Sequence, residues 1–323
     1  MRETANLDAW DAVVAAFLSS RRAIGRAYLN EEYALLHLRR FLVQSGVADL
    51  DAATFDRWRH QFQHLSASSR VKREHAVYKL CRYRRRTDPA CFLPDRDTLA
   101  RQTPHALPTI VGADQVQRLL AYVSDLPPGS RSPLRAQVLR LAVVLLYTAG
   151  LRRGELVRLT LADVDALSGV LRIRESKFHK SRWVPLSPSA RAELQAYLAA
   201  RRRAGLDERP AAPLLCTAHA RAYSCQGLYN SVKQALRDAG IRGDGGRVPR
   251  MQDFRHSFAV AALLRWYETD ADVQSSLPKL ALYMGHVSIV STAYYLRWMP
   301  AVVSKASARF ARSCAGVIDG GAS

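Results

Sequence analysis

The segment from Pro89 to Gly112 constrains the fold of this chain more than any other. It contains four prolines among scattered polar residues and has no hydrophobic period. Proline lacks a backbone N–H and restricts both its own φ and the residue before it, so no long helix or central strand can continue through such a segment. The chain is therefore expected to fold as two domains joined by a linker at residues 91–112. A length of 323 residues agrees with this division.

Residues 1–90 show helical periodicity throughout. Apolar residues at positions 10, 13, 14, 17 and 18 predict a helix over 8–19, and similar spacing predicts helices over 29–43, 51–62 and 69–86. Asn30 followed by two glutamates suits the start of the second helix. The first domain should therefore be entirely helical.

The fourth predicted helix is strongly cationic. Between residues 70 and 86 it carries eight basic residues and a single acidic one, Glu74. A helix face of one sign repels itself unless bound anions neutralise it, whereas ordinary solvated faces mix both signs. We therefore expect DNA to contact this helix through Arg70, Lys72, Arg73, Lys79, Arg82, Arg85 and Arg86.

Residues 113–323 predict a second, mostly helical domain with a short tail from about residue 299. An amphipathic helix over 114–123 precedes a nearly all-apolar helix over 136–147, and short strands are expected at 169–174 and 182–186. Helices follow to the end of the chain. The expected fold class is mainly α with a small β-sheet, α+β.

The charge of the chain indicates a polyanionic partner. Lys and Arg number 48 against 28 Asp and Glu, which gives a net charge of +20. The excess is +6 before residue 110 and +14 after it, so both domains share it. Biased codon usage explains why 41 of the 48 are Arg, but it does not explain the net charge. Nucleic acid is the favoured partner.

Other functional classes are disfavoured. The five cysteines form no CxxC pair and no metal-ligand spacing, which predicts reduced thiols and neither a disulfide framework nor a metal site. The longest apolar stretch, near residues 141–147, is too short to cross a bilayer, and residues 1–20 lack the order of a signal peptide. A cytoplasmic, nucleoid-associated protein is expected.

Four short stretches of the second domain carry candidate chemistry. They are Y-T-A-G-L-R-R-G-E-L-V-R-L-T-L-A-D (147–163), S-K-F-H-K-S-R-W-V-P-L (176–186), Q-D-F-R-H-S-F (252–258) and M-G-H-V-S-I-V-S-T-A-Y-Y (284–295). Each alone has an ordinary explanation: a surface arginine at a helix start, solvated lysines in a hairpin turn, or a histidine and tyrosines of a core. Together they supply Arg, Lys, His and Tyr, the side chains that phosphoryl transfer without a metal requires.

In order and spacing these stretches resemble the tyrosine recombinase (phage integrase) family, including its transposon-associated members. The matching patterns are G-L-R-x-x-E-L-x-x-L-x-x-x-D, K-x-x-K-x-R-x-V-P-L, D-[hydrophobic]-R-H-[ST]-F, and G-H with a Tyr nine residues after the His. The resemblance covers roughly residues 110–310, and the basic helical domain in front is similar to the core-binding domain of the family.

The resemblance implies a role for each matched residue. Tyr295 corresponds to the nucleophile; it is preferred to Tyr294 because it lies at the distance of the family from the histidine. Lys177 is preferred to Lys180 as the hairpin lysine for the same reason of register. The remaining assignments are the paired arginines Arg152 and Arg255, the histidine His286, the orienting carboxylate Glu155, and the DNA contacts Lys180 and Arg182.

Position 252 departs from the family pattern. The family most often has His there, and Gln252 cannot accept a proton at neutral pH. Either base catalysis at this position is dispensable, with water or His256 assisting, or the protein is a slow enzyme or a non-cleaving relative. Retention of the arginines, lysine, histidine and tyrosine favours an active enzyme.

The implied activity is site-specific recombination through a covalent 3′-phosphotyrosine, with no metal, ATP or other cofactor. Conservation of bond energy in the phosphotyrosyl link removes the need for ATP. The implied partners are double-stranded DNA bearing a recombination site and further copies of the chain, two per site and four in synapsis. A type IB topoisomerase-like enzyme and a DNA-binding protein that does not cleave are the alternatives.

Overall fold

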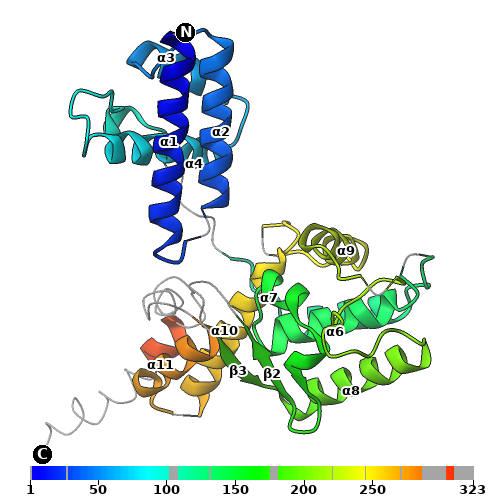
Figure 1. Cartoon of the computed structure of the whole chain (residues 1–323). Helices are drawn as coiled ribbons and strands as arrows, with labels where there is room; N and C mark the ends of the chain where they lie inside the picture. Colours follow the sequence, from blue (N-terminus) through cyan, green and yellow to red (C-terminus); the bar gives the residue numbers. More distant parts are fainter. Residues whose placement is uncertain are drawn as a thin grey trace, which may run out of the picture. The chain divides into compact units, whose positions relative to one another are not determined.

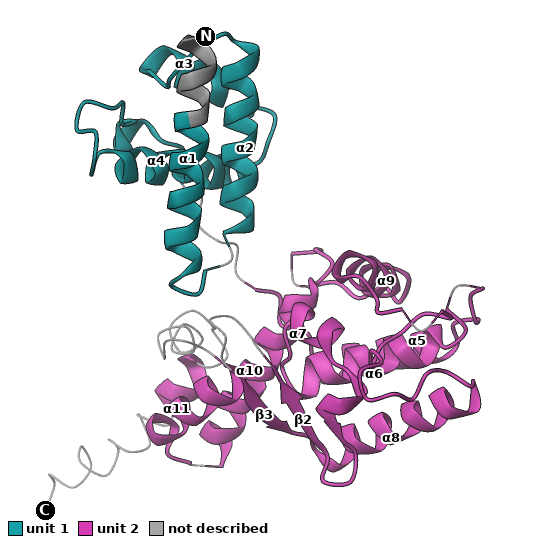
Figure 2. Cartoon of the chain, viewed as in Figure 1, with its two compact units in different colours: residues 1–106 teal, residues 107–323 magenta. Residues whose placement is uncertain are grey.

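The computed structural model describes residues 2–26, 28–101, 108–130, 132–174, 181–219, 221–243, 245–269, 271–285 and 303–308, with the backbone alone for 2–8. Figure 2 shows two compact units, Met1–Ala106 and Leu107–Ser323. The predicted fold class, mainly α with a small β-sheet, is confirmed.

The first unit contains helices at each of the four predicted places. They are α1 (Arg2–Arg22), α2 (Leu29–Gln44), α3 (Ala52–His60) and α4 (Ala67–Arg84), followed by a 3-10 turn η1 (Arg96–Thr98) (Figure 1). Asp51 caps α3 by accepting from the backbone N–H of Thr54 at 2.7 Å, and Ser66 caps α4 through Ser69. Trp58 and Phe17 are buried at the centre of this unit among leucines of α2 and α4.

Both described ends of the predicted linker belong to the units that they adjoin. Cys91 and Leu99 are buried, and the backbone N–H of Ala100 donates to Glu74 of α4 at 2.7 Å. On the other side, Val111 is buried in the core of the second unit. Residues at both described ends of the predicted linker 91–112 therefore pack on the adjoining units, and the linker itself stays a prediction. Prolines end helices in this segment, but they do not prevent its apolar residues from packing on a neighbouring core.

The second unit surrounds the apolar helix α6 (Arg135–Thr148). This helix contacts α5 (Ala113–Ser124), α7 (Arg153–Arg158), α8 (Pro188–Arg203), α9 (Cys225–Asp238) and α10 (Met251–Glu268). Eight of its residues are buried, which agrees with its nearly continuous apolar sequence. Helix α11 (Val273–Met284) packs on α10 in a separate hydrophobic cluster.

A small antiparallel sheet completes the second unit. It has the strand order β1 (Val164–Asp165), β2 (Val170–Ile173) and β3 (Arg182–Pro185), with a 3-10 turn η2 (Leu161–Asp163) leading into it. Leu171 pairs with Val184 and both are buried. Strand β3 contacts α11 (Figure 1). The sheet therefore lies against the helix that directly precedes the predicted catalytic residue His286.

Helix α10 is longer than its apolar sequence indicates. Its run of apolar residues begins at Phe258, whereas α10 begins at Met251. Asp253 makes this earlier start possible because its carboxylate accepts from the backbone N–H of Arg250 at 2.8 Å. Gln252 and Arg255 therefore lie in the first turns of a helix and not in a loop.

Candidate active site

Arg152 stands at the junction of two helices. Gly150 ends α6 with a left-handed φ of +59°, and Arg152 is the N-cap residue of α7. One turn on, Glu155 accepts from the backbone N–H of Arg152 at 2.9 Å and from its Nη1 at 2.7 Å. The sequence spacing of three residues therefore fixes both the backbone and the guanidinium of Arg152.

Glu155 is also bound by a second arginine. Arg182 of β3 donates from Nη1 to Oε1 at 3.0 Å and from Nη2 to Oε2 at 2.9 Å. Only 3% of Glu155 is exposed. Burial alone would raise the pKa of this carboxyl, but the hydrogen bonds and charge of Arg182, with the hydrogen bonds of Arg152, lower it to about 2. Glu155 is therefore an anion at neutral pH.

Arg255 reaches the same place from α10. Its side chain is almost entirely enclosed, with the residue 4% exposed, and Nη1 donates to the carbonyl of Gly150 at 2.5 Å. Its Nη2 donates to the carbonyl of Met284, and Nη2 of Arg152 donates to the carbonyl of Gly285 at 2.9 Å. The two arginines, far apart in the sequence, thus bind consecutive carbonyls at the C-terminal end of α11.

Both arginines line one cavity of about 360 Å³. Gln252 lines it as well, so three of the predicted catalytic residues meet here. The complete lining is Leu151, Arg152, Arg153, Gly154, Tyr229, Arg250, Met251, Gln252 and Arg255. Four of these residues are arginines, so the cavity suits an anion that accepts several hydrogen bonds, such as a phosphodiester.

Three polar lining residues were not singled out from the sequence. The guanidinium of Arg153 lies 5.5 Å from the ring centroid of Tyr229, and Arg250 pairs with Asp253 at 2.9 Å. Arg153 and Arg250 are each within two residues of a predicted catalytic residue, which was the available signal. Tyr229 comes from α9, and no feature of its local sequence connects it with the other residues.

His256 faces a different environment from Gln252. It is not among the described residues that line the cavity, and burial lowers its pKa to about 4, against the opposing charge of Asp253. His256 is therefore neutral at pH 7 and is set back from the cavity. This position does not favour it as the group that replaces the missing histidine at 252.

Four predicted catalytic or DNA-contacting residues lie outside the described residues: Lys177, Lys180, His286 and Tyr295. The tail from about 299 is described only at 303–308. Gly285, the residue before His286, ends α11 with a left-handed φ of +65°. The chain therefore turns at Gly285, whose carbonyl binds Arg152, immediately before His286.

The structure places Arg182, a predicted DNA contact, inside the second unit. Its side chain is 8% exposed, its two Nη groups bind Glu155, and its Nε donates to the carbonyl of Tyr283 at 2.7 Å. Strand β3 turns this side chain inward, as its low exposure shows. The contact of Arg182 with DNA therefore stays a prediction, while its described bonds are all within the second unit.

Several α4 cations also have partners within the first unit. Arg73 lies over the ring of Phe62, Lys79 over Tyr28, and Arg86 over Tyr83, while Arg85 donates to the carbonyl of Cys91 at 3.2 Å. Lys72 and Arg82 are exposed. The predicted cationic face is therefore only partly a free surface.

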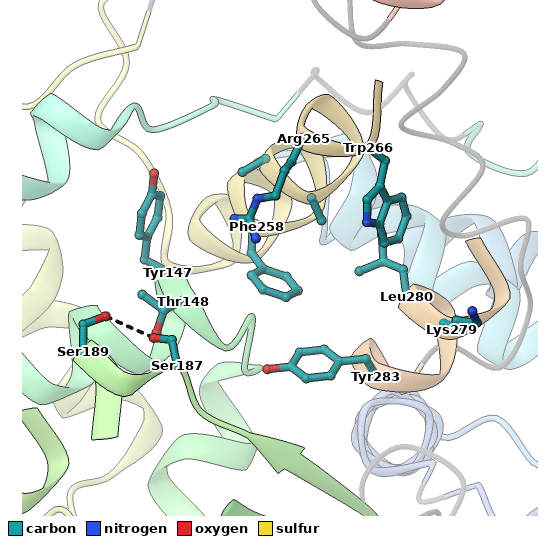
Figure 3. A pocket seen from close by; sticks show the side chains of 12 residues that line it. Tyr147, Thr148, Ser187, Ser189, Phe258, Arg265, Trp266, Lys279, Leu280 and Tyr283 are labelled. Atoms are coloured by element: carbon teal, nitrogen blue, oxygen red, sulfur yellow. Dashed lines mark hydrogen bonds between the residues drawn. The ribbon is translucent and has the colours of Figure 1, made fainter. Parts of the chain in front are cut away.

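A second cavity, of about 630 Å³, lies beside α10 and α11 (Figure 3). Its wall includes the stacked rings of Phe258 and Tyr283, whose centroids are 5.4 Å apart, together with Trp266 and Leu280. None of the predicted catalytic residues that the structure describes lines it. Its size therefore does not make it the better candidate site.

The described residues contain no group of three or more His, Cys, Asp or Glu side chains that could hold a metal ion. In that same part of the chain, no helix is long and apolar enough to cross a membrane.

Comparison with known proteins gives one consistent result. The model of the phage integrase family matches residues 110–300. A putative integrase/recombinase of Sinorhizobium fredii, y4rB, is 32% identical over 302 residues, which cover 93% of this chain and 96% of the relative. Tyrosine recombinase XerD of Xanthomonas axonopodis pv. citri is 32% identical over 263 residues, 77% of this chain and 79% of XerD.

Solved structures agree in fold. The Tn1549 transposon integrase, in complex with a circular intermediate DNA, aligns with a TM-score of 0.64 over 93% of this chain and 98% of that chain, at 17% identity. At this identity the likeness concerns the arrangement of helices and strands and not the individual side chains.

Proposed function

The chain belongs to the phage integrase family of tyrosine recombinases, and from this membership we propose that it cuts and rejoins DNA at a specific site through a covalent 3′-phosphotyrosine. Its class, a tyrosine-type site-specific recombinase, follows from the family and from the XerD relative. The covalent intermediate, the residues that form it and the DNA partner are parts of the proposal.

The observation that carries the proposal is the meeting of Arg152 and Arg255. Both line the cavity of about 360 Å³, and both bind carbonyls at the end of α11. Transfer of a phosphodiester builds negative charge on the non-bridging oxygens of a five-coordinate phosphorus. Guanidiniums fixed in advance at such oxygens stabilise this charge without reorganisation, an effect commonly worth about 3–4 kcal/mol for each donor removed.

Tyr295 supplies the attacking oxygen in this proposal. Its hydroxyl attacks the scissile phosphorus, the bond to the 5′ oxygen breaks, and a 3′-phosphotyrosyl ester forms. Neighbouring guanidiniums favour the phenolate over the phenol. Lys177 donates the proton that the departing 5′ oxygen takes up, and His286 hydrogen-bonds a non-bridging oxygen. Attack by a 5′ hydroxyl of a second strand reverses these steps and restores the tyrosine.

Gln252 binds phosphate rather than moving a proton. Its exposed amide lies on the cavity wall with Arg152 and Arg255, so its N–H groups can donate to a phosphate oxygen. The tyrosine proton then passes to water. This assignment predicts an active enzyme without the histidine that the family usually has at this position.

Double-stranded DNA with a recombination site is the proposed substrate. The net charge of +20 and the exposed cations of α4, Lys72 and Arg82, support binding to phosphates that depends strongly on salt. Rejoining between two sites requires paired protomers on each site and a tetramer in synapsis. The transposon integrase of similar fold was itself solved with DNA.

A catalytically impaired DNA-binding relative is the second candidate, and Gln252 is the observation that favours it. A nicked duplex separates the two. Candidate sites come from the ends of the DNA element that carries the gene. The nick is placed so that cleavage releases a short fragment carrying the 5′ hydroxyl, which diffuses away and leaves the protein trapped on the DNA.

The expected result is a covalent protein–DNA band on a denaturing gel that Tyr295→Phe abolishes and Tyr294→Phe retains. Binding to the same duplex without any covalent band would refute the recombinase activity and favour the DNA-binding relative that does not cleave. Relaxation of supercoiled DNA lacking the site would instead indicate topoisomerase-like activity.

A further inference from the structure

We propose that Arg182 is a positioning residue for the recombinase reaction. By binding both oxygens of the Glu155 carboxylate, Arg182 prevents Arg152 from binding them both and so leaves Arg152 directed toward the phosphate. The inference rests on the proposed function for its catalytic consequence, but its structural part can be measured without DNA.

Glu155 is shared by two arginines in unequal ways. Arg182 binds both of its oxygens, at 3.0 and 2.9 Å, whereas the side chain of Arg152 binds Oε1 alone, at 2.7 Å. The backbone N–H of Arg152 takes Oε2 at 2.9 Å. Each carboxylate oxygen therefore already accepts two hydrogen bonds, and a second side-chain bond from Arg152 has no place.

This arrangement leaves donors of Arg152 for a ligand. Of its five N–H groups, Nη1 supplies one to Glu155 and Nη2 supplies one to the carbonyl of Gly285. The Arg152 side chain is 30% exposed at the wall of the cavity, in contrast to 8% for Arg182. Arg182 thus uses its Nη donors on the buried Glu155 carboxylate, and Arg152 keeps donors that can bind the reacting phosphate.

Removal of Arg182 changes this balance. A buried carboxylate that loses one of two cations attracts the remaining one more strongly, and paired Arg–carboxylate bonds are the preferred geometry. Arg152 would then bind both oxygens of Glu155, release Gly285 and leave the cavity wall.

Arg182 also ties the hairpin to this site. Its Nε donates to the carbonyl of Tyr283 at 2.7 Å, and a Cβ added to Gly285 would lie 2.8 Å from its Nη1. Strand β3, helix α7 and the end of α11 therefore share one side chain. The same link holds the carbonyl of Gly285 beside Arg152.

The first test measures the reactivity of Arg152 toward phenylglyoxal in the full-length protein without DNA, read from the peptide that contains it. The variant Arg182→Gln is expected to slow modification of Arg152 severalfold, because both Nη groups of Arg152 bind Glu155 in this variant. The double variant Glu155→Gln/Arg182→Gln removes the attracting anion and should restore reactivity. Unchanged reactivity in Arg182→Gln would overturn the proposal, and so would a double variant as slow as the single one.

The matched control is Arg140→Gln. Arg140 forms another bidentate pair with a glutamate of the same unit, at 2.8 and 2.5 Å to Glu193, outside the cavity. Its loss should leave the reactivity of Arg152 unchanged. A similar slowing in this control would mean that loss of any such pair loosens the fold, which would contradict a specific role for Arg182.

The second test compares single-turnover cleavage of saturating nicked duplex with a phosphodiester or a neutral methylphosphonate at the cleaved position. On the phosphodiester, Arg182→Gln should lower the rate by about 100-fold, the effect of losing one transition-state donor, with Arg182→Lys between it and wild type. On the methylphosphonate, which carries no anionic oxygen for Arg152 to stabilise, the difference should shrink to about 10-fold or less. An equal loss on both substrates would refute positioning through Arg152.

The two tests separate the two proposals. If wild-type protein forms no covalent link while phenylglyoxal modification of Arg152 follows Arg182 as expected, the recombinase mechanism fails and the positioning role of Arg182 stands. If cleavage proceeds normally in Arg182→Gln, the positioning role fails and the recombinase mechanism stands.

Discussion

Gly150 offers a quantitative test of how the site is assembled, through the substitution Gly150→Ala. Its φ of +59° is a conformation that L side chains rarely adopt. A Cβ at this position would lie 2.6 Å from Cδ1 of Phe258, whose ring stacks on Tyr283 as Figure 3 shows. The carbonyl of the same residue binds Arg255 at 2.5 Å, so the substitution acts directly beside a predicted catalytic side chain.

The expected loss of stability has two parts. The left-handed backbone costs an alanine about 1–2 kcal/mol. Contact with the Phe258 ring adds about 1–3 kcal/mol, the usual cost of inserting atoms into a packed core, because the stacked partner Tyr283 restricts the movement of the ring. Gly150→Ala should therefore destabilise the second unit by about 2–5 kcal/mol in total.

Comparison with Gly205→Ala separates the packing cost from the backbone cost. Gly205 has a nearly identical φ of +63° at the end of α8, but no atom lies within 4 Å of an added Cβ. It should cost only the backbone part. Urea unfolding, read by hydrogen exchange of α6 peptides so that only the second unit is reported, measures both variants. The Phe258→Leu background should reduce the cost of Gly150→Ala and leave that of Gly205→Ala unchanged. Equal costs for the two glycines would refute the packing argument.

Three further predictions concern charge. The folded-state pKa of His256, about 4, lies below its usual 6.5, so its contribution to stability is present above pH 6.5 and is lost as the pH falls toward 4. The loss in the free energy of unfolding is about 3 kcal/mol. His256→Asn should remove this pH dependence of the free energy of unfolding, as measured by urea unfolding between pH 6.5 and 4. The pKa of Glu155, about 2, predicts a separate loss below pH 4.5, which should persist in His256→Asn and would be contradicted by acid stability that is flat down to pH 2. Lys72→Ala and Arg82→Ala should each lower the slope of log affinity for DNA against log salt by about 0.9, whereas Arg84→Ala, which removes the 2.6 Å pair with Asp49, should lower the melting temperature of the first unit and leave that slope unchanged.

The local sequence was sufficient for most helices and for one half of the site. The spacing of apolar residues predicted α1 to α6, and Arg152 and Glu155, three residues apart, are in contact across one helical turn. These features depend on neighbours within one or two turns. Strand β1 was not predicted, because two residues form no pattern.

Side-chain direction was the property that local sequence described least well. Arg182 and the cations of α4 belong to segments rich in positive charge, and the charge alone suggested DNA. Partners within the protein come from elsewhere in the chain: Glu155 for Arg182, and the ring of Phe62 for Arg73. Packing at the ends of the predicted linker also depends on distant residues, since the contact of Ala100 with Glu74 spans 26 residues.

The sequence by itself determined which residue types are present, their order, and the family to which they belong. Only the tertiary structure decided that Arg255 binds carbonyls 105 and 29 residues away, beside the carbonyl that Arg152 binds. Periodicity and capping act over a few residues, whereas the direction of a guanidinium depends on which distant acceptors the packed helices bring within 3 Å of it.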